Sequence, residues 1–477
     1  MTQPMTQLTT PSTTQDVVFS DATRLAELIR TRQLSPVEVV QAHLDRIAAV
    51  DPQINAIVTV ADGALAAAKE AEAAVMAGRE LGPLHGVPFT VKDSIDTAGV
   101  MTQRGSPIFK GRTPEADATS VARLKQAGGI LLAKTNLPEF SYWIESDNLL
   151  SGRSNNPWDL TRTPGGSSGG ESAAIAAGMS PLGLGTDLAI SVRGPAAQTG
   201  IVSLKGTHGR VPMTGIWPRA PRRFWHVGPM ARSIRDLALA FSLLAGPDGE
   251  DGYASRFEAG AAPAPDRPLR VGWLVEPGFG PVDSEVAATV RAAAEALASL
   301  GHTVEAVRIP ALERDFALDV FNKLHVMEMK PAFRAATAGH EDQMYTMART
   351  MLSLPDTTMA EYVAAEQAAE RLRDGYAAYF RDHDILLTPV LPVPAHKHGI
   401  QELVVDGKTV DLTYLQGATV PLNVTGLPGL SMRFGTSREG LPINVQVVGS
   451  WQAEATILHA AALLEGVSPV RGLHPSL

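Results

Sequence analysis

The chain has 477 residues, of which 44% are hydrophobic and 19% charged, the composition of an ordinary folded protein. Its formal net charge of −9 repels nucleic-acid phosphates, so we expect no nucleic-acid partner. The sequence has no cysteine, which excludes disulfides, thiolate nucleophiles and Cys-based metal sites. No apolar stretch approaches the roughly 20 residues that span a bilayer. No signal peptide is recognisable either, so we expect a cytoplasmic protein without membrane contact.

The N-terminal part of the chain predicts a polar tail followed by helices. Residues 1–17 are rich in Thr, Gln, Ser and Pro, so we expect a disordered tail there and a single domain over residues 18–477. Ser35 and Pro36 form a helix cap with a first-turn proline. Apolar or alanine-rich helical patterns cover residues 25–29, 37–47 and about 62–77.

Short apolar runs rich in β-forming residues predict buried strands through the rest of the chain. A helical pattern over 117–127 separates the first two runs, which indicates a strand, helix, strand order. The economical interpretation is an α/β fold with a large mixed β-sheet flanked by helices on both faces. The expected strands are 87–91, 129–133, 201–204, 269–275, 303–309, 385–387, 429–434 and 443–448, with further helices near 233–245 and 283–299.

The stretch of about 312–380 is different, because Met, Ala and Tyr stand in it where strand residues would be expected. It predicts a helical, insert-like segment. Two interpretations stay open: a mobile cap over the sheet, or peripheral packing helices.

Ser167 and Ser168 lie in the most unusual stretch of the chain, Pro-Gly-Gly-Ser-Ser-Gly-Gly at 164–170. Glycines at this density permit backbone geometries that other residues cannot hold. A Gly-rich loop before a helix can also bind phosphate, but this one lacks the Gly-Lys-Ser/Thr ending of such loops. We therefore consider these serines candidates for chemistry.

Ser191 is a third candidate, in the segment Gly-Leu-Gly-Thr-Asp-Leu-Ala-Ile-Ser-Val-Arg at 183–193. A serine nucleophile needs a base, and none of the twelve histidines lies in a glycine-framed turn like these serines. A lysine can replace histidine where burial lowers its pKa. Lys92 is such a lysine, at the end of an apolar run and beside Asp93 and Ser94.

These segments resemble the amidase signature family, whose hallmark is a glycine-serine-rich segment followed by Gly-Thr-Asp and Ser-x-Arg. Family members pair a lysine at a strand end with two serines 24 residues apart, the separation of Ser167 and Ser191, and Lys92 stands in the matching Val-Lys-Asp context. The core signature region covers about 85–240. The likeness extends through further landmarks at 85–88, 134–140, 228–233 and 441–446.

The resemblance implies that Ser191 is the nucleophile, Ser167 a bridging serine on a cis peptide bond, and Lys92 the terminal base, without a metal or cofactor. The implied oxyanion hole consists of the backbone N–H groups of Leu188, Ala189, Ile190 and Ser191. The residues expected to support this loop without taking part in chemistry are Ser168, Asp187 and Arg193.

Ala189 and Ile190 depart from the family, in which Gly-Gly usually precedes the nucleophile. Isoleucine is β-branched and resists a positive φ. The loop must therefore use dihedral angles open to L-residues or be rearranged. The added side chains also take up space beside the acyl site, so we expect them to change which acyl groups fit.

The nearest resemblance is to the bacterial aryl-acylamidase and urethanase branch, which acts on anilides and aromatic carbamates. We therefore expect an amide-type C–N bond hydrolase with a small-molecule amide or carbamate substrate. Candidates for an apolar pocket wall follow family motifs, although each also suits plain core packing. They are Tyr142, Trp143, Ile216, Trp217 and Phe224.

Two rival functions stay open. The glutaminase subunit of a tRNA-dependent amidotransferase shares the triad but works only within a complex. It usually carries Ser-Arg-Tyr/Phe-Gly after Lys-Pro-Thr, whereas this chain reads Lys-Gly-Thr-His-Gly-Arg-Val-Pro at 205–212, which disfavours it. A catalytically silent binding homologue is the other rival, and the presence of all three triad residues gives it no support. Lys134 and Lys205 lie in segments that the family uses structurally.

Overall fold

The computed structural model describes residues 14–254, 264–275 and 279–477. Its strands are β1 (Ile57–Val60), β2 (Pro88–Lys92), β3 (Ile130–Thr135), β4 (Leu182–Asp187), β5 (Val202–Lys205), β6 (His226–Ala231), β7 (Arg270–Trp273), β8 (Thr303–Ala306), β9 (Ile385–Pro389), β10 (Glu402–Val405), β11 (Lys408–Asp411), β12 (Gly429–Thr436) and β13 (Pro442–Gly449).

The helices complete the element order. They are α1 (Thr14–Val18), α2 (Ala22–Arg30), α3 (Pro36–Ile54), α4 (Ala64–Met76), η1 (Pro107–Phe109), α5 (Thr119–Gln126), η2 (Glu139–Ser141), α6 (Gly169–Ala176), α7 (Arg193–Thr199), α8 (Ile234–Leu244), α9 (Ser284–Ser299), α10 (Pro310–Arg314), α11 (Ala317–Thr337), η3 (Glu341–Gln343), α12 (Thr346–Ser353), α13 (Met359–Asp382), η4 (Leu412–Gln416), α14 (Val420–Thr425) and α15 (Glu454–Val467).

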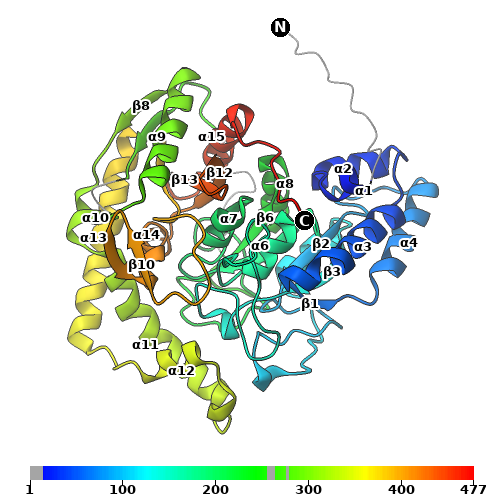
Figure 1. Cartoon of the computed structure of the whole chain (residues 1–477), viewed down its shortest axis with the longest axis horizontal. Helices are drawn as coiled ribbons and strands as arrows, with labels where there is room; N and C mark the ends of the chain where they lie inside the picture. The colour runs from blue at the N-terminus through cyan, green and yellow to red at the C-terminus, as the bar shows by residue number, and fades with distance from the viewer. Residues whose placement is uncertain (1–13, 255–263, 276–278) are drawn as a thin grey trace.

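Eleven strands form one mixed sheet in the order β1-β3-β2-β4-β6-β5-β12-β13-β9-β7-β8 (Figure 1). Strand β2 runs parallel to β3 and β4, whereas β4 is antiparallel to β6 and β12 is antiparallel to β13. The strands of the sheet centre are buried along their length, and helices flank them, as α/β packing requires. The structure confirms the predicted fold class.

Strand β4 is central to the sheet, although the sequence did not predict it. Its sequence, Leu-Gly-Leu-Gly-Thr-Asp, contains glycines that strands disfavour. A Cβ on Gly183 would lie 1.7 Å from Glu171 Oε1, and one on Gly185 would lie 2.8 Å from Ser168 Oγ. The glycines thus permit a close approach of β4 to the start of α6. The other unpredicted strands are β1, β6, β10 and β11.

The structure agrees with the helical prediction for residues 312–380 but differs from the tail prediction where it describes the N-terminal residues. Residues 1–13 of the expected tail lie outside the described residues, and the structure places residues 14–17 in helix α1 instead. The stretch 312–380 is helical as predicted and forms most of α10, α11, α12 and α13, which lie along one side of the molecule (Figure 1). Helix α11 packs against α13 and α14. Within the described ranges, no helix is long and apolar enough to cross a membrane.

Candidate active site

Lys92 is the last residue of β2 and is fully buried. Its Nζ lies 2.6 Å from Ser167 Oγ and 2.9 Å from Thr186 Oγ1. Strand β2 pairs with β4 on one side, and this pairing carries Lys92 toward Thr186 near the end of β4. Among the described residues, the hydrogen-bond partners of Lys92 are these two hydroxyl groups, each of which can either donate or accept a hydrogen bond.

Ser167 precedes α6 and is joined to Gly166 by a cis peptide bond, as the resemblance implies. There is no room for a side chain at Gly166, where a Cβ would lie 2.5 Å from the backbone nitrogen of Glu145. The next residue, Ser168, donates its backbone N–H to the carbonyl oxygen of Ser191 at 3.2 Å. The structure thus brings together the end of β2, the glycine-serine loop and the loop after β4.

The loop from Leu188 to Ser191 accommodates the unusual Ala-Ile pair without strain. Ala189 and Ile190 both have negative φ, so the first of the two options open from the sequence is the correct one. The Ile190 side chain occupies the space over Gly194, where a Cβ would lie 2.5 Å from Ile190 Cγ1. Glycine at 194 therefore provides the room that isoleucine at 190 needs.

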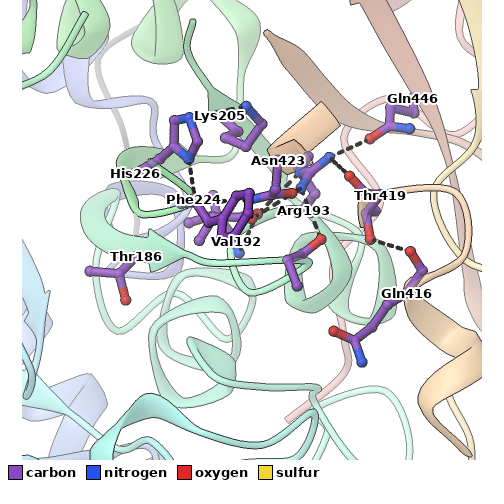
Figure 2. A network of polar contacts seen from close by, with 12 residues as sticks. Thr186, Val192, Arg193, Lys205, Phe224, His226, Gln416, Thr419, Asn423 and Gln446 are labelled. Atoms are coloured by element: carbon purple, nitrogen blue, oxygen red, sulfur yellow. Dashed lines mark hydrogen bonds and ion pairs between the residues drawn. The ribbon is translucent and has the colours of Figure 1, made fainter. Parts of the chain in front are cut away.

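Arg193 lies within a network of polar contacts that includes this loop (Figure 2). Its guanidinium group forms a fully buried ion pair with Asp187 at 3.0 Å and donates to the carbonyl oxygen of Ala189 at 3.1 Å. Asp187 also accepts the backbone N–H of Val192 at 3.1 Å. Further acceptors of the guanidinium group are Thr419 O, Gln446 Oε1 and Asn423 Oδ1. Charge-assisted hydrogen bonds of this kind are strong, so the pair connects the ends of the loop to the surrounding structure.

The surroundings of Lys92 favour its neutral form. Complete burial holds the pKa of Lys92 well below its ordinary value, and the charges of Asp187 and Glu171 offset this only in part. Glu171, on α6, is itself fully buried, and burial raises its pKa to about 7. Its carboxylate accepts hydrogen bonds from Thr90 and Thr135. A neutral Lys92 amine has a lone pair that can accept a proton.

Lys134 and Lys205 are equally buried but have different partners. Lys134 Nζ donates to the carbonyl oxygen of Ile95 and to the hydroxyls of Thr97 and Thr102, which themselves donate to backbone carbonyls. Lys205 Nζ donates to the carbonyl oxygen of Leu427 at 2.6 Å and to that of Gly206, and contacts His226 Nε2. Within the described ranges, neither lysine has a hydrogen bond to a serine hydroxyl, so neither is placed to receive a proton from one.

Ser191 and its loop line a cavity of about 90 Å³. The segment after η2 supplies Tyr142 and Trp143, as predicted. Ile216, Trp217 and Phe224 are not among the lining residues, which corrects the prediction. The described residues that line the cavity are Ser141, Tyr142, Trp143, Ile144, Leu188, Ala189, Ile190, Ser191, Phe321, Asn322, His325, Thr413 and Gln416.

Ile216, Trp217 and Phe224 have other packing partners in the structure. Trp217 stacks on Phe333 of α11 and meets Phe140 edge to face. Phe224 packs against Phe321, which is one of the residues that line the cavity. Ile216 forms an isolated β-bridge with Ile95. Position after a family motif therefore did not distinguish a lining residue from one that packs a layer deeper.

Several residues at this site were not found from the sequence. Thr186 contacts Lys92 and could have been noticed, because it stands inside the Gly-Thr-Asp motif. Phe321, Asn322 and His325 come from α11, where the sequence shows no landmark. Among the described residues, no group of His, Asp and Glu is placed to hold a metal ion.

Comparisons with known proteins give matches over most of the chain. A family model described as Amidase matches residues 38–458. The glutamyl-tRNA(Gln) amidotransferase A-type subunit of Symbiobacterium thermophilum is 36% identical over 96% of this chain and 98% of its own length. Its counterpart in Acidothermus cellulolyticus is also 36% identical, over 94% of each chain.

Two solved structures extend the likeness. A 6-aminohexanoate cyclic dimer hydrolase superposes with a TM-score of 0.86 at 31% identity and covers 96% of this chain and 99% of its own. A bacterial aryl acylamidase described as an amidase signature enzyme superposes with a TM-score of 0.87 at 27% identity, over 94% and 96% of the two chains. This chain therefore belongs to the amidase signature family of hydrolases.

Proposed function

We propose that the chain is a serine hydrolase of amide-type bonds that uses Ser191 as nucleophile, Ser167 as bridge and Lys92 as base. The observation that carries this proposal is the contact of Ser167 Oγ with the Nζ of a fully buried lysine whose pKa is held low. Ser167 follows a cis peptide bond, and the backbone N–H of Ser168 binds the carbonyl oxygen of Ser191. These contacts connect the three residues through adjacent segments.

In the proposed reaction, neutral Lys92 accepts a proton from Ser167 while Ser167 accepts one from Ser191. Ser191 Oγ forms a bond to the carbonyl carbon, and the C–N bond then breaks as the relay returns a proton to the leaving amine. Water hydrolyses the acyl-serine. An amide yields a carboxylic acid, whereas a carbamate yields a carbonic half-ester that decomposes to an alcohol and carbon dioxide.

The backbone N–H groups of Leu188, Ala189, Ile190 and Ser191 are proposed to stabilise the oxyanion. Within the described part of the chain, none of the four donates a hydrogen bond to a protein acceptor. By contrast, the N–H groups of Val192 and Gly194 are both bonded within the loop. Free donors beside the nucleophile support this assignment, since one such donor contributes about 3 kcal/mol to transition-state binding.

The residues that line the cavity suit an uncharged part of the substrate. None of the described residues that line it is Lys, Arg, Asp or Glu. His325 is buried, and burial lowers its pKa to about 4, so it is neutral at pH 7. Tyr142, Trp143 and Phe321 are the aromatic residues among the described residues that line the cavity, apart from His325. Such a lining fits the uncharged acyl part of an amide or carbamate. The substrates we propose are aryl amides and aromatic carbamates, and the likeness to the aryl acylamidase supports their aryl group.

A glutaminase subunit is the second candidate, favoured by the amidotransferase relatives. Glutamine carries an α-carboxylate and an α-ammonium group, and burying either charge unpaired is costly. The uncharged cavity lining therefore disfavours glutamine as the substrate. A catalytically silent homologue is disfavoured by the intact Lys92 and Ser167 contact.

The test uses the isolated full chain with a 4-nitroanilide, a matched alkyl 4-nitrophenylcarbamate and glutamine. We expect hydrolysis of the first two and not of glutamine, with Ser191→Ala as background. A fluorophosphonate should react with loss of fluoride and leave its phosphonyl group on the peptide that contains Ser191. Glutamine turnover without anilide turnover would favour the glutaminase subunit instead. No turnover and no labelling would indicate a silent homologue.

A further inference from the structure

Ser141 is a buried polar residue of the cavity that the proposed chemistry does not use. It lines the same cavity as Ser191, and only 4% of its surface is exposed. Its Oγ has no hydrogen-bond partner among the described residues. A buried hydroxyl without a partner is unfavourable, and such groups in folded proteins need an explanation. A ligand atom that completes its hydrogen bond is one such explanation.

Three neighbouring polar side chains of the cavity, those of His325, Tyr142 and Thr413, have protein partners. His325 Nδ1 lies 2.8 Å from the carbonyl oxygen of Phe321, which can only accept, so Nδ1 carries the hydrogen. His325 Nε2 is then an acceptor and receives the Tyr142 hydroxyl at 3.1 Å. Thr413 donates its hydroxyl to Asp411. Ser141 therefore differs from these residues in having no protein partner within the described structure.

The backbone around Ser141 is held in an unusual conformation. Phe140 and Ser141 have φ of 56° and 60°, in the left-handed region that L-residues adopt only where the surroundings enforce it. The Phe140 ring packs edge to face against Trp217 and Phe333, with centroids 5.2 and 5.0 Å away. This packing fixes the bend that places Ser141 at the cavity. Such strain is common at ligand sites.

The size of the cavity indicates which part of the substrate enters it. A cavity of about 150 Å³ holds a benzene ring, whereas this one measures about 90 Å³. A short acyl or alkoxycarbonyl chain is the part of the proposed substrate that matches this smaller volume best. The aromatic amine of the proposed substrate would then remain outside it.

We infer that Ser141 is a specificity-determining residue whose hydroxyl donates a hydrogen bond to an oxygen atom within the acyl chain, beyond the scissile carbonyl. The preferred substrates would then have an ether, alkoxy or similar oxygen where a simple alkyl amide has a methylene. This inference rests on the proposed function, because it needs Ser191 to be acylated.

The experiment compares three nearly isosteric derivatives of 4-nitroaniline. The butyramide has a methylene at both positions of its chain, the ethyl carbamate has an oxygen next to the carbonyl, and the methoxyacetamide has an oxygen one atom further. The ratio of kcat/KM for each oxygen-containing substrate to that of the butyramide is measured in the wild type, Ser141→Ala and Ser141→Gly. Intrinsic reactivity cancels when the ratios are compared between variants.

We expect both variants to lower at least one ratio by about three- to tenfold, the effect of one neutral hydrogen bond. Ser141→Gly also relaxes the positive φ, so agreement between the two variants separates the hydroxyl from backbone strain. Ser120 on α5 is the matched control, since its Oγ is also buried without a partner in the described structure, and Ser120→Ala should leave the ratios unchanged.

Ratios that change by less than twofold in both variants would overturn the inference. Equal losses on all three substrates would also overturn it, because they would indicate a structural role. A wild-type chain inactive on all three substrates would instead refute the proposed function.

Discussion

Lys92 Nζ and Ser167 Oγ lie 2.6 Å apart, although 75 residues separate them in the sequence. Strand β2 brings the lysine to this point, and the glycine-serine loop before α6 brings the serine. Lys134 and Lys205 are as deeply buried, yet they contact no serine hydroxyl. The contact therefore distinguishes one lysine among three by its partners and not by its burial.

Substitution of Lys92 should separate catalysis from stability. We expect Lys92→Ala to lower kcat/KM by about 10²- to 10⁴-fold, the usual contribution of a general base. Lys134→Ala should instead lower the free energy of unfolding by about 1–3 kcal/mol, because it leaves buried acceptors unpaired. Urea unfolding and anilide kinetics on both variants check this. A Lys92→Ala rate within a few-fold of the wild type would contradict the relay.

We expect kcat/KM to fall on the acid side of its pH profile, which we call the acid limb. The base acts as a neutral amine, so activity is present above the pKa of Lys92 and is lost as the pH falls through it. Because burial lowers that pKa, the limb should lie well below the ordinary lysine value. A profile of log kcat/KM against pH measures it.

Glu171→Gln provides a directional test of the same pKa. The Glu171 charge raises the pKa of Lys92, so its removal should move the acid limb to lower pH. The isosteric amide occupies the same space between Thr90 and Thr135. A shift of the limb to higher pH would show that another group controls it.

The Arg193 and Asp187 pair should be essential for stability. Both side chains are fully buried, so Arg193→Met leaves Asp187 as an unpaired buried charge and should cost about 3–5 kcal/mol of unfolding free energy. Arg308→Ala breaks an exposed pair with Glu313 and serves as the control, with little change expected. Equal effects of the two substitutions in urea unfolding would contradict this account.

Gly183 should not tolerate a side chain. Its Cβ would lie 1.7 Å from Glu171 Oε1, so Gly183→Ala must displace a buried carboxylate beside Lys92. We expect a loss of about 1–3 kcal/mol, as for overpacking, and a loss of activity. Gly466→Ala in α15 meets nothing within 4 Å and should be neutral or stabilising by up to about 1 kcal/mol. Differential scanning calorimetry compares the two variants.

Two of the differences between the sequence predictions and the structure have identifiable physical causes. Strand β4 was missed because Gly183 and Gly185 weaken a strand pattern, yet they are what permits contact with Glu171 and Ser168. Trp217 and Phe224 were placed at the cavity because they are aromatic and follow motifs. Aromatic character does not reveal which layer a ring packs in, and here Phe333 and Phe321 lie beside them.

The sequence by itself determined the α/β class, the family and the three residues proposed for the triad, because these depend on local periodicity and on motifs at fixed spacing. Only the tertiary structure decided which residues line the cavity. Its walls come from η2, the loop after β4, α11 and η4, which meet through packing between segments far apart in the chain. The tertiary structure also decided that the Ser141 hydroxyl is buried without a hydrogen-bond partner among the described residues. Whether a hydroxyl has a partner depends on every segment that folds around it.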